Sequence, residues 1–257
     1  MTANHKLLVE NDGPVTVITI NRPEVRNALD NETAAELTRA LRAFDGTPDQ
    51  AVAVLTGAGG NFCAGADLKE LAAGREYKPW AGDPDGPCHD LLSKPVIAAV
   101  AGYACAGGLG IALRCDLRVA EESATFAVLS RRWGVPMSDG TTVRLPRLIG
   151  AGRALDMLLT ARKISGAEAV AMGLADRLVP TGQALPTAIE LAREIADFPQ
   201  IAMRSDRMSA MRQWNLSEAE AIALETSLSL EARQKEARSG ATRFASGMGR
   251  HGAMEND

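Results

Sequence analysis

The chain has 257 residues, of which 46% are hydrophobic and 23% charged, so it can bury the core of one large domain or of one domain with an appendage. Its formal net charge of −4 argues against nucleic acid as the main partner, because phosphate binding favours a basic surface. No apolar run reaches the roughly 18 residues of a membrane span, and residues 1–6 lack the apolar stretch of a secretory signal, so we expect a cytoplasmic protein with no membrane partner.

Strands and helices are predicted to alternate in the first half of the sequence. Residues 7–9 and 15–20 flank an Asn-Asp-Gly turn and predict a hairpin. Apolar residues then recur at helical spacing after Asp30, and either Asp30 or Asn31 can cap this helix. Three short apolar runs are typical of buried strands: 51–56, 95–100 and 117–120. Strands separated by helix-sized intervals predict an α/β core.

The second half of the sequence is predicted to be mostly helical. Segments 165–168 and 217–220 both have the Ser-x-x-Glu pattern of a capping box, so a helix is expected at each. From about residue 186 to 244, no segment has the character of a strand. We therefore predict a core over residues 1–190 and a helical C-terminal region over residues 191–257.

Two glycine-rich turns, 57–69 and 102–112, follow two of the predicted buried strands. A glycine turn between a strand and a helix points free backbone N–H groups and the helix dipole at one place. Two such turns on adjacent strands can aim two N–H donors at one oxygen, which is an oxyanion hole. The alternative is that both are tight turns that only allow close packing. Neither turn has the Walker or GxGxxG spacing, which argues against ATP and NAD.

The segments 61–69 and 94–104 resemble the crotonase (enoyl-CoA hydratase/isomerase) superfamily. The resemblance runs in order over about residues 5–200, and further matching segments are 17–23, 27–29, 115–120, 144–150 and 169–179. It implies an α/β fold, a spiral of ββα turns with a helical C-terminal trimerisation region. It also implies a lyase or isomerase of fatty acid metabolism. The substrate would be an acyl-CoA thioester with no further cofactor, and the assembly a homotrimer or a hexamer.

Carried over to this sequence, the resemblance assigns the oxyanion-hole N–H groups to Ala66 and Gly107. Gly107 is expected at a helix N-terminus, where the dipole and the hydrogen bond act in the same direction. The remaining substrate-binding or CoA-binding positions implied by the resemblance are Ala64, Gly65, Asp67 and Gly108. No metal site is expected, because the cysteines and histidines lack zinc spacing.

Hydratases of this family use two glutamates, and both positions differ here: Gly110 and Ser130 stand in their place. Neither residue can act as a carboxylate base, and each lost acid or base group lowers the rate by roughly 10²–10⁴. Asp139 is the remaining carboxylate that we nominate for proton transfer, with capping of a helix near Gly140 as the alternative role. Restoring glutamate at both positions is a test of the scaffold, because a gain of hydratase activity would show that it still places the thioester correctly.

Three weaker candidates have structural alternatives. Arg131 and Arg132 can pair with Asp139, a substrate carboxylate or a CoA phosphate, or they can be solvated surface residues. Cys63 and Cys105 flank the expected site, yet buried cysteine usually acts as a small hydrophobe. Residues 74–87 are rich in glycine and proline and predict a mobile surface loop.

These residues favour isomerase-type chemistry with one base over standard hydration, because moving a double bond needs only one proton shuttle. The alternative is a catalytically silent acyl-CoA-binding protein in which Gly110 and Ser130 reflect lost activity. A nucleotide-binding or purely structural protein is a rival class. The identity of the acyl group is not encoded in any motif of the sequence.

Overall fold

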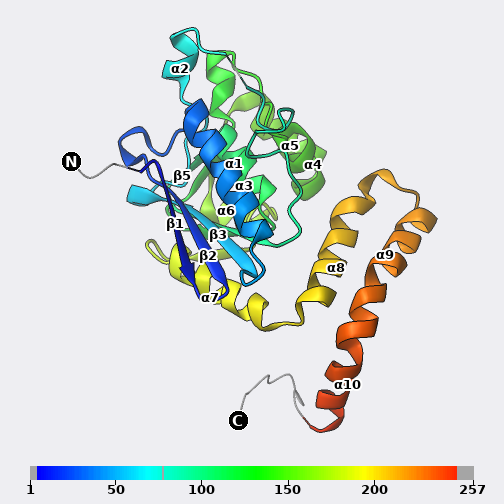
Figure 1. Ribbon diagram of the computed structural model, residues 1–257. Helices are drawn as coiled ribbons and strands as arrows, with labels where there is room; N and C mark the ends of the chain where they lie inside the picture. The colour runs from blue at the N-terminus through cyan, green and yellow to red at the C-terminus, as the bar shows by residue number, and fades with distance from the viewer. Residues whose placement is uncertain (1–4, 77, 248–257) are drawn as a thin grey trace. The chain divides into compact units, whose positions relative to one another are not determined.

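The computed structural model describes residues 5–76 and 78–247. The chain divides into two compact units, Met1–Ile195 and Ala196–Asp257 (Figure 1). The first unit contains every strand among the described residues, and the second consists of helices joined by short connections in its described part.

A six-stranded sheet forms the centre of the first unit, with the strand order β1-β2-β3-β4-β6-β9. Its strands are β1 (Leu7–Asp12), β2 (Val15–Ile20), β3 (Val52–Gly57), β4 (Val96–Val100), β6 (Leu117–Glu121) and β9 (Arg177–Val179). The first two strands pair antiparallel, and all other neighbours are parallel. The predicted hairpin and the three predicted buried strands are therefore confirmed. Strands β3 and β4 are almost wholly buried, as continuous aliphatic runs in a parallel sheet require.

A second, smaller sheet has the strand order β5-β7-β8, with β5 at Tyr103–Cys105, β7 at Thr125–Ala127 and β8 at Ile164–Ser165. The chain passes from β4 into β5 and then into α3, and from β6 into β7 and then into α4. The second glycine-rich turn, 102–112, begins where the chain passes from β4 to β5, and Cys63 of the first turn forms a β-bridge with Ala104 of β5. This repeated strand–strand–helix order matches the expected spiral of ββα turns.

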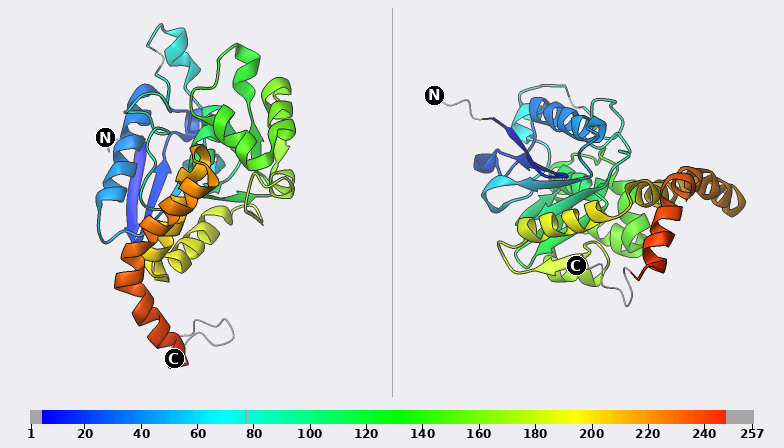
Figure 2. Two further views of the ribbon diagram at one scale, coloured as in Figure 1. Left: turned by 90° about the vertical axis from the view of Figure 1, so that its right-hand side faces the viewer. Right: turned by 60° about the horizontal axis from the view of Figure 1, so that its bottom comes forward.

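Helices surround the two sheets of the first unit. They are α1 (Asn31–Gly46), α2 (Leu68–Ala72), α3 (Gly107–Arg114), α4 (Thr141–Ile149), α5 (Ala151–Thr160), α6 (Gly166–Ala171) and α7 (Ala184–Asp197). Helix α1 packs beside β1 and β2 (Figure 2). Its N-cap is Asp30, whose carboxylate accepts the Thr33 N–H at 2.8 Å, so the predicted cap is confirmed. The Ser165 hydroxyl likewise accepts the Glu168 N–H at the start of α6.

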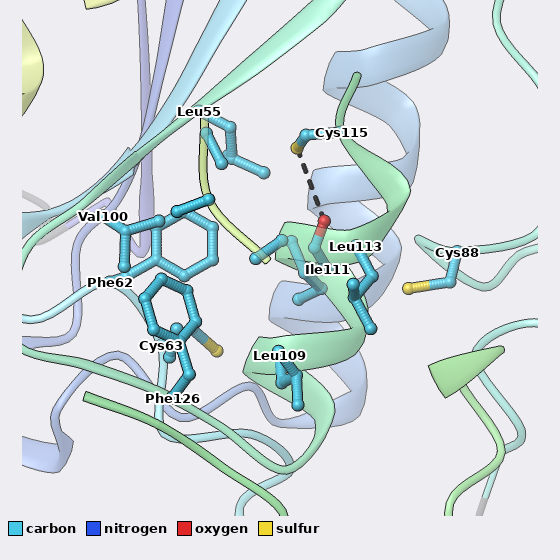
Figure 3. Close-up of a cluster of buried hydrophobic side chains, with 14 of the residues drawn as sticks. Leu55, Phe62, Cys63, Cys88, Val100, Leu109, Ile111, Leu113, Cys115 and Phe126 are labelled. Atoms are coloured by element: carbon cyan, nitrogen blue, oxygen red, sulfur yellow. Dashed lines mark hydrogen bonds between the residues drawn. The ribbon is translucent and has the colours of Figure 1, made fainter. Parts of the chain in front are cut away.

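The core of the first unit is aliphatic, with two fully buried phenylalanines, Phe62 and Phe126. They belong to one cluster with Leu109 and Ile111 of α3 (Figure 3). Four cysteines are buried as free thiols, and burial raises the pKa of Cys63 to about 12, with similar values for the other three. The cysteines that flank the glycine turns are therefore small hydrophobes at neutral pH.

The second unit is a helical hairpin. Its helices are α8 (Gln200–Arg212), α9 (Glu218–Ala232), the π-helical turn Arg233–Ala237 and α10 (Arg238–Ala245). Helices α8 and α9 pack against each other (Figure 1). The predicted capping box at Ser217 is confirmed, since Ser217 and Glu220 satisfy each other's backbone N–H groups. None of the helices among the described residues is both long and apolar enough to cross a membrane.

Candidate active site

The two glycine-rich turns are held together by backbone hydrogen bonds. The Cys63 N–H donates to the Tyr103 carbonyl at 2.8 Å, and the Cys105 N–H donates to the Cys63 carbonyl at 3.0 Å. Gly108 packs against this contact so closely that a Cβ there would lie 2.0 Å from the Cys63 oxygen. The sequence therefore needs glycine at position 108 to bring the start of α3 onto the first turn.

Two backbone N–H groups at this junction, those of Ala66 and Gly107, have no acceptor among the described residues. Gly107 is the first residue of α3, where a helix leaves its N–H groups unpaired. Ala66 lies between two residues whose backbone groups both bond to Leu29, at 2.8 Å each. Gly65 adopts φ +104°, and a Cβ there would lie 3.0 Å from the Gly107 nitrogen. The turns thus place the two free N–H groups near one another.

Ala66 and Gly107 both border one cavity of about 190 Å³. Its walls are mostly apolar and include Leu68, Leu129 and Met137. The polar side chains of Ser130 and Asp139 border the same space. Apolar walls with a few converging polar groups are typical of small-molecule sites.

Asp139 combines a buried carboxyl group with a position on the cavity wall; the residue is only 4% exposed. Its Oδ1 accepts the Thr141 N–H at 2.9 Å, and Arg144 Nη1 donates to its backbone carbonyl at 2.8 Å. Burial raises the pKa of Asp139 and outweighs the hydrogen bonds from Thr141 and the positive charge of Arg144, which lower it. The carboxylate binds the N–H at the start of α4, which is close to the capping role considered from the sequence, whereas its role in proton transfer stays a prediction.

The Asp139 carboxyl group fills the space beside Gly110. A Cβ built on Gly110 would lie 2.3 Å from Asp139 Cγ and 2.6 Å from its Oδ2. A side chain at position 110 and the present position of Asp139 therefore exclude each other. Restoring glutamate at position 110 therefore requires the Asp139 carboxyl group to move.

Ser130 is buried and donates its hydroxyl to the Met137 sulfur at 3.2 Å. It lies on the cavity wall in the short helix Leu129–Trp133, near the beginning of the connection from β7 to α4. The thioether that accepts this hydrogen bond is too weak a base to activate a hydroxyl. Ser130 thus shapes the cavity without replacing a carboxylate.

Of the other residues predicted from the sequence, one borders the cavity, and the rest pack or bond the segments next to it. Ala64 borders the cavity, whereas Gly65 and Gly108 pack the two turns together. Asp67 caps α2 through the Lys69 N–H at 3.1 Å and forms an ion pair with Arg22 at 3.1 Å. It borders a smaller neighbouring cavity instead.

Arg131 and Arg132 are exposed, and within the described part of the chain neither forms an ion pair with Asp139. The solvated alternative for these two residues is the one that the structure favours. Across residues 5–76 and 78–247, no group of three or more His, Cys, Asp or Glu side chains is placed to hold a metal ion.

Trp80 is a site residue that the sequence analysis did not identify. It lies in the glycine- and proline-rich segment 74–87, yet it is only 7% exposed, and its ring covers Gly107, where a Cβ would lie 2.4 Å from Trp80 Cζ3. The Cys88 N–H donates to the Trp80 carbonyl at 3.0 Å, which fixes the backbone. A lone tryptophan in an otherwise polar loop is the signal that could have marked this anchor.

Comparisons with known proteins agree with one another. The family model described as Enoyl-CoA hydratase/isomerase matches residues 10–248. The chain is 40% identical over 231 residues to enoyl-CoA hydratase EchA19 of Mycobacterium tuberculosis, covering 87% of each chain. It is 34% identical over 228 residues to the short-chain-enoyl-CoA hydratase of Clostridium acetobutylicum, covering 86% of this chain and 87% of the relative. The crystal structure of enoyl-CoA hydratase EchA1 from Mycobacterium marinum superposes with a TM-score of 0.89 at 33% identity, covering 94% and 96% of the two chains.

Proposed function

Because the chain belongs to the enoyl-CoA hydratase/isomerase family of the crotonase superfamily, we propose that its cavity binds an acyl-CoA thioester and that the enzyme shifts a double bond in the acyl group. The N–H groups of Ala66 and Gly107 would donate to the thioester oxygen, with the dipole of α3 adding to the same effect. The substrate brings its own coenzyme A, and the proton transfer needs no further cofactor.

The observation that carries this proposal is that the Asp139 carboxyl group occupies the volume that a side chain at position 110 would need. At position 110, where family hydratases have a glutamate, this chain has no side chain, and the Asp139 carboxyl fills the room instead. Ser130 leaves the second glutamate position without a carboxylate. Among the described residues that line the cavity, Asp139 is the only carboxylic acid, which suits isomerisation better than the hydratase mechanism with two glutamates.

In the proposed reaction the Asp139 carboxylate removes a proton from the α-carbon of a 3-enoyl-CoA. The electron pair of the broken C–H bond delocalises into a dienolate, whose negative charge lies largely on the thioester oxygen between the two N–H groups. The protonated Asp139 then returns the proton to the γ-carbon, and the double bond moves to the 2-position. Burial favours this role because a base with a raised pKa binds the transferred proton more firmly.

Two absorbance assays on the purified protein test the proposal. Formation of the conjugated 2-enoyl thioester from a 3-enoyl-CoA reports isomerisation, and loss of crotonyl-CoA absorbance reports hydration. We expect the first reaction to proceed and the second to be slower by at least roughly 10², because both glutamates are missing. Efficient hydration together with no isomerisation would overturn the assignment of the reaction.

A catalytically silent acyl-CoA-binding protein is the second candidate, and one contact favours it. The Asp139 carboxylate already binds the Thr141 N–H, which is a structural task that needs no catalysis. Calorimetric titration with saturated acyl-CoAs and free CoA separates binding from chemistry. Thioester binding without any turnover would favour this candidate, and ATP or NAD binding without CoA binding would contradict both.

We further propose that the chain assembles as a homotrimer, or as a hexamer of two trimers. Ala232 is the only buried residue among those described in the second unit. Apolar side chains such as Ile222 and Leu230 of α9 are more than half exposed in the single chain. A helical hairpin with almost no core of its own is expected to gain its stability from contacts with other copies. Leu191 of α7, in contrast, is buried within its own chain.

A further inference from the structure

Trp80 separates the cavity that contains the free N–H groups from two smaller spaces. One of these, of about 30 Å³, lies beside Leu29 and Leu71, and the other, of similar size, lies beside Ala34 of α1. Among the described residues, Trp80 is the only one that borders all three spaces. Its indole ring is therefore a wall between them.

Close contacts surround both the backbone and the ring of Trp80. The backbone of Trp80 is packed so tightly against Gly86 that a Cβ there would lie 2.2 Å from the Trp80 oxygen. The neighbouring Ala81 N–H donates to the Ser138 carbonyl at 2.9 Å, next to Asp139. The ring itself rests on Gly107, so no side chain other than hydrogen fits at that position.

The exposure of the two cavity tryptophans indicates the direction in which a thioester would lie. Trp133 is 70% exposed and marks the open side, whereas Trp80 is 7% exposed and marks the closed end. Coenzyme A is far larger than a cavity of about 190 Å³, so it must extend through the open side. The acyl group then points towards Trp80.

We propose that Trp80 limits the acyl group to short chains by closing the inner end of the cavity. This inference rests on the acyl-CoA binding proposed above and adds the class of substrate. Replacing the indole with a small side chain frees the volume of the ring itself and joins the cavity to the spaces beside Leu29 and Ala34, whose walls contain both apolar and charged residues. A longer acyl chain then gains buried methylene groups that the wild-type wall excludes.

The test is a calorimetric series of saturated acyl-CoAs from acetyl to decanoyl, measured with wild type, Trp80→Ala and Trp80→Leu. Saturated chains cannot isomerise, so the result is independent of turnover. Wild type is expected to gain affinity over the first few carbons and then stop or weaken. Each Trp80 variant is expected to continue gaining about fourfold per added methylene over at least the next two carbons. Trp80→Leu retains part of the packing on Gly107 and serves if Trp80→Ala does not fold.

Trp133→Ala is the matched control, because it removes the same side chain from the open side of the same cavity. It is expected to change the affinity for all chain lengths by a similar factor and to leave the length limit in place. A limit that is unchanged in both folded Trp80 variants, or that moves equally in Trp133→Ala, would overturn the role of Trp80 alone. If no thioester binds wild type more tightly than free CoA, the proposed function fails, and this inference fails with it.

Discussion

Gly110 and Asp139 lie 29 positions apart in the sequence but compete for one volume beside the cavity. The smallest side chain that tests this competition is a methyl group. Gly110→Ala is expected to displace the Asp139 carboxyl and to lower isomerase activity about 10²-fold, because a shift of about 1 Å in a catalytic group can cost that much. The assay is the rate of double-bond isomerisation, with circular dichroism to establish that the variant is folded.

Gly152→Ala is the control for this prediction, since a Cβ at Gly152 in α5 meets nothing within 4 Å. It should keep full activity. Equal activity in Gly110→Ala and Gly152→Ala would show that Asp139 does not depend on the empty space at position 110.

The contact between Gly110 and Asp139 also determines whether glutamates introduced at positions 110 and 130 can give hydratase activity. The double variant Gly110→Glu and Ser130→Glu is expected to remain a poor hydratase while Asp139 occupies the space. Adding Asp139→Gly removes the side chain from this space. The rate of crotonyl-CoA hydration should then rise by a factor of at least about 10² over the double variant, which is the gain expected for one recovered acid–base group. Full hydratase activity in the double variant alone would contradict the steric argument.

Burial of Asp139 also predicts a dependence of stability on pH. An unfolded chain ionises this carboxyl near its ordinary value of 3.8, whereas burial keeps the proton bound to a higher pH in the folded chain. The folded state therefore binds more protons between the two pKa values, so the stability contributed by Asp139 falls as the pH rises through that window. Asp139→Asn has no ionisable group at this position, so its stability does not fall for this reason. Its thermal midpoint, measured from about pH 4 upwards, should rise relative to wild type across the window and stay higher above it. A constant difference between the two midpoints at every pH would refute this account.

Only some features of the candidate active site could be predicted from the sequence. The free N–H groups of Ala66 and Gly107 were implied by the family resemblance, because a backbone donor has no side-chain signature. The contact of Asp139 with Gly110, and the position of Trp80 on Gly107, depend on loops that meet only in the folded chain. No local pattern encodes them.

Among the elements, α3 is held at both ends. Its first residue faces the cavity, and its last turn is fixed by Arg118 of β6, which is almost fully buried. The guanidinium donates to the carbonyls of Ala112 and Cys115 at 3.4 and 2.8 Å, and to that of Leu174 at 2.7 Å. Arg118 thus links the helix that carries Gly107 to the sheet.

Arg118→Leu is expected to lower the free energy of unfolding by about 3 kcal/mol, because it leaves buried carbonyls without donors. Chemical denaturation measures this change. Arg162→Leu is the control, since Arg162 is paired with Glu168 at 2.8 Å on the surface, and it should cost much less. Losses of similar size in the two variants would show that Arg118 has no special structural role.

Strands and helices with a strong pattern were predictable, and short ones were not. Strand β4 has five buried aliphatic residues in a row, and α1 has both a periodic apolar face and an aspartate cap. Strands β5, β7 and β8 have only two or three residues each, too few for a period to be recognised. They form the second sheet by pairing with partners distant in the sequence.

For the whole molecule, the expected assembly can be measured directly. Light scattering at micromolar concentration is expected to give at least three times the 27.1 kDa of one chain. Ile222→Asp in α9 places a charge on the exposed apolar surface and should shift the population towards monomer. Glu218→Asp, a change between acidic residues at the start of the same helix, should leave the mass unchanged. A monomeric wild-type mass would contradict the proposed trimer.

The central claim is that one carboxylate, that of Asp139, carries the proton in a double-bond shift. Its most direct test is the isomerisation rate of a 3-enoyl-CoA by wild type and by Asp139→Asn, in which the amide oxygen can still accept the Thr141 N–H. The two proteins are first matched for binding of a saturated acyl-CoA. We predict that the variant binds normally and isomerises at least roughly 10²-fold more slowly. A variant rate within about threefold of wild type would show that Asp139 is not the base.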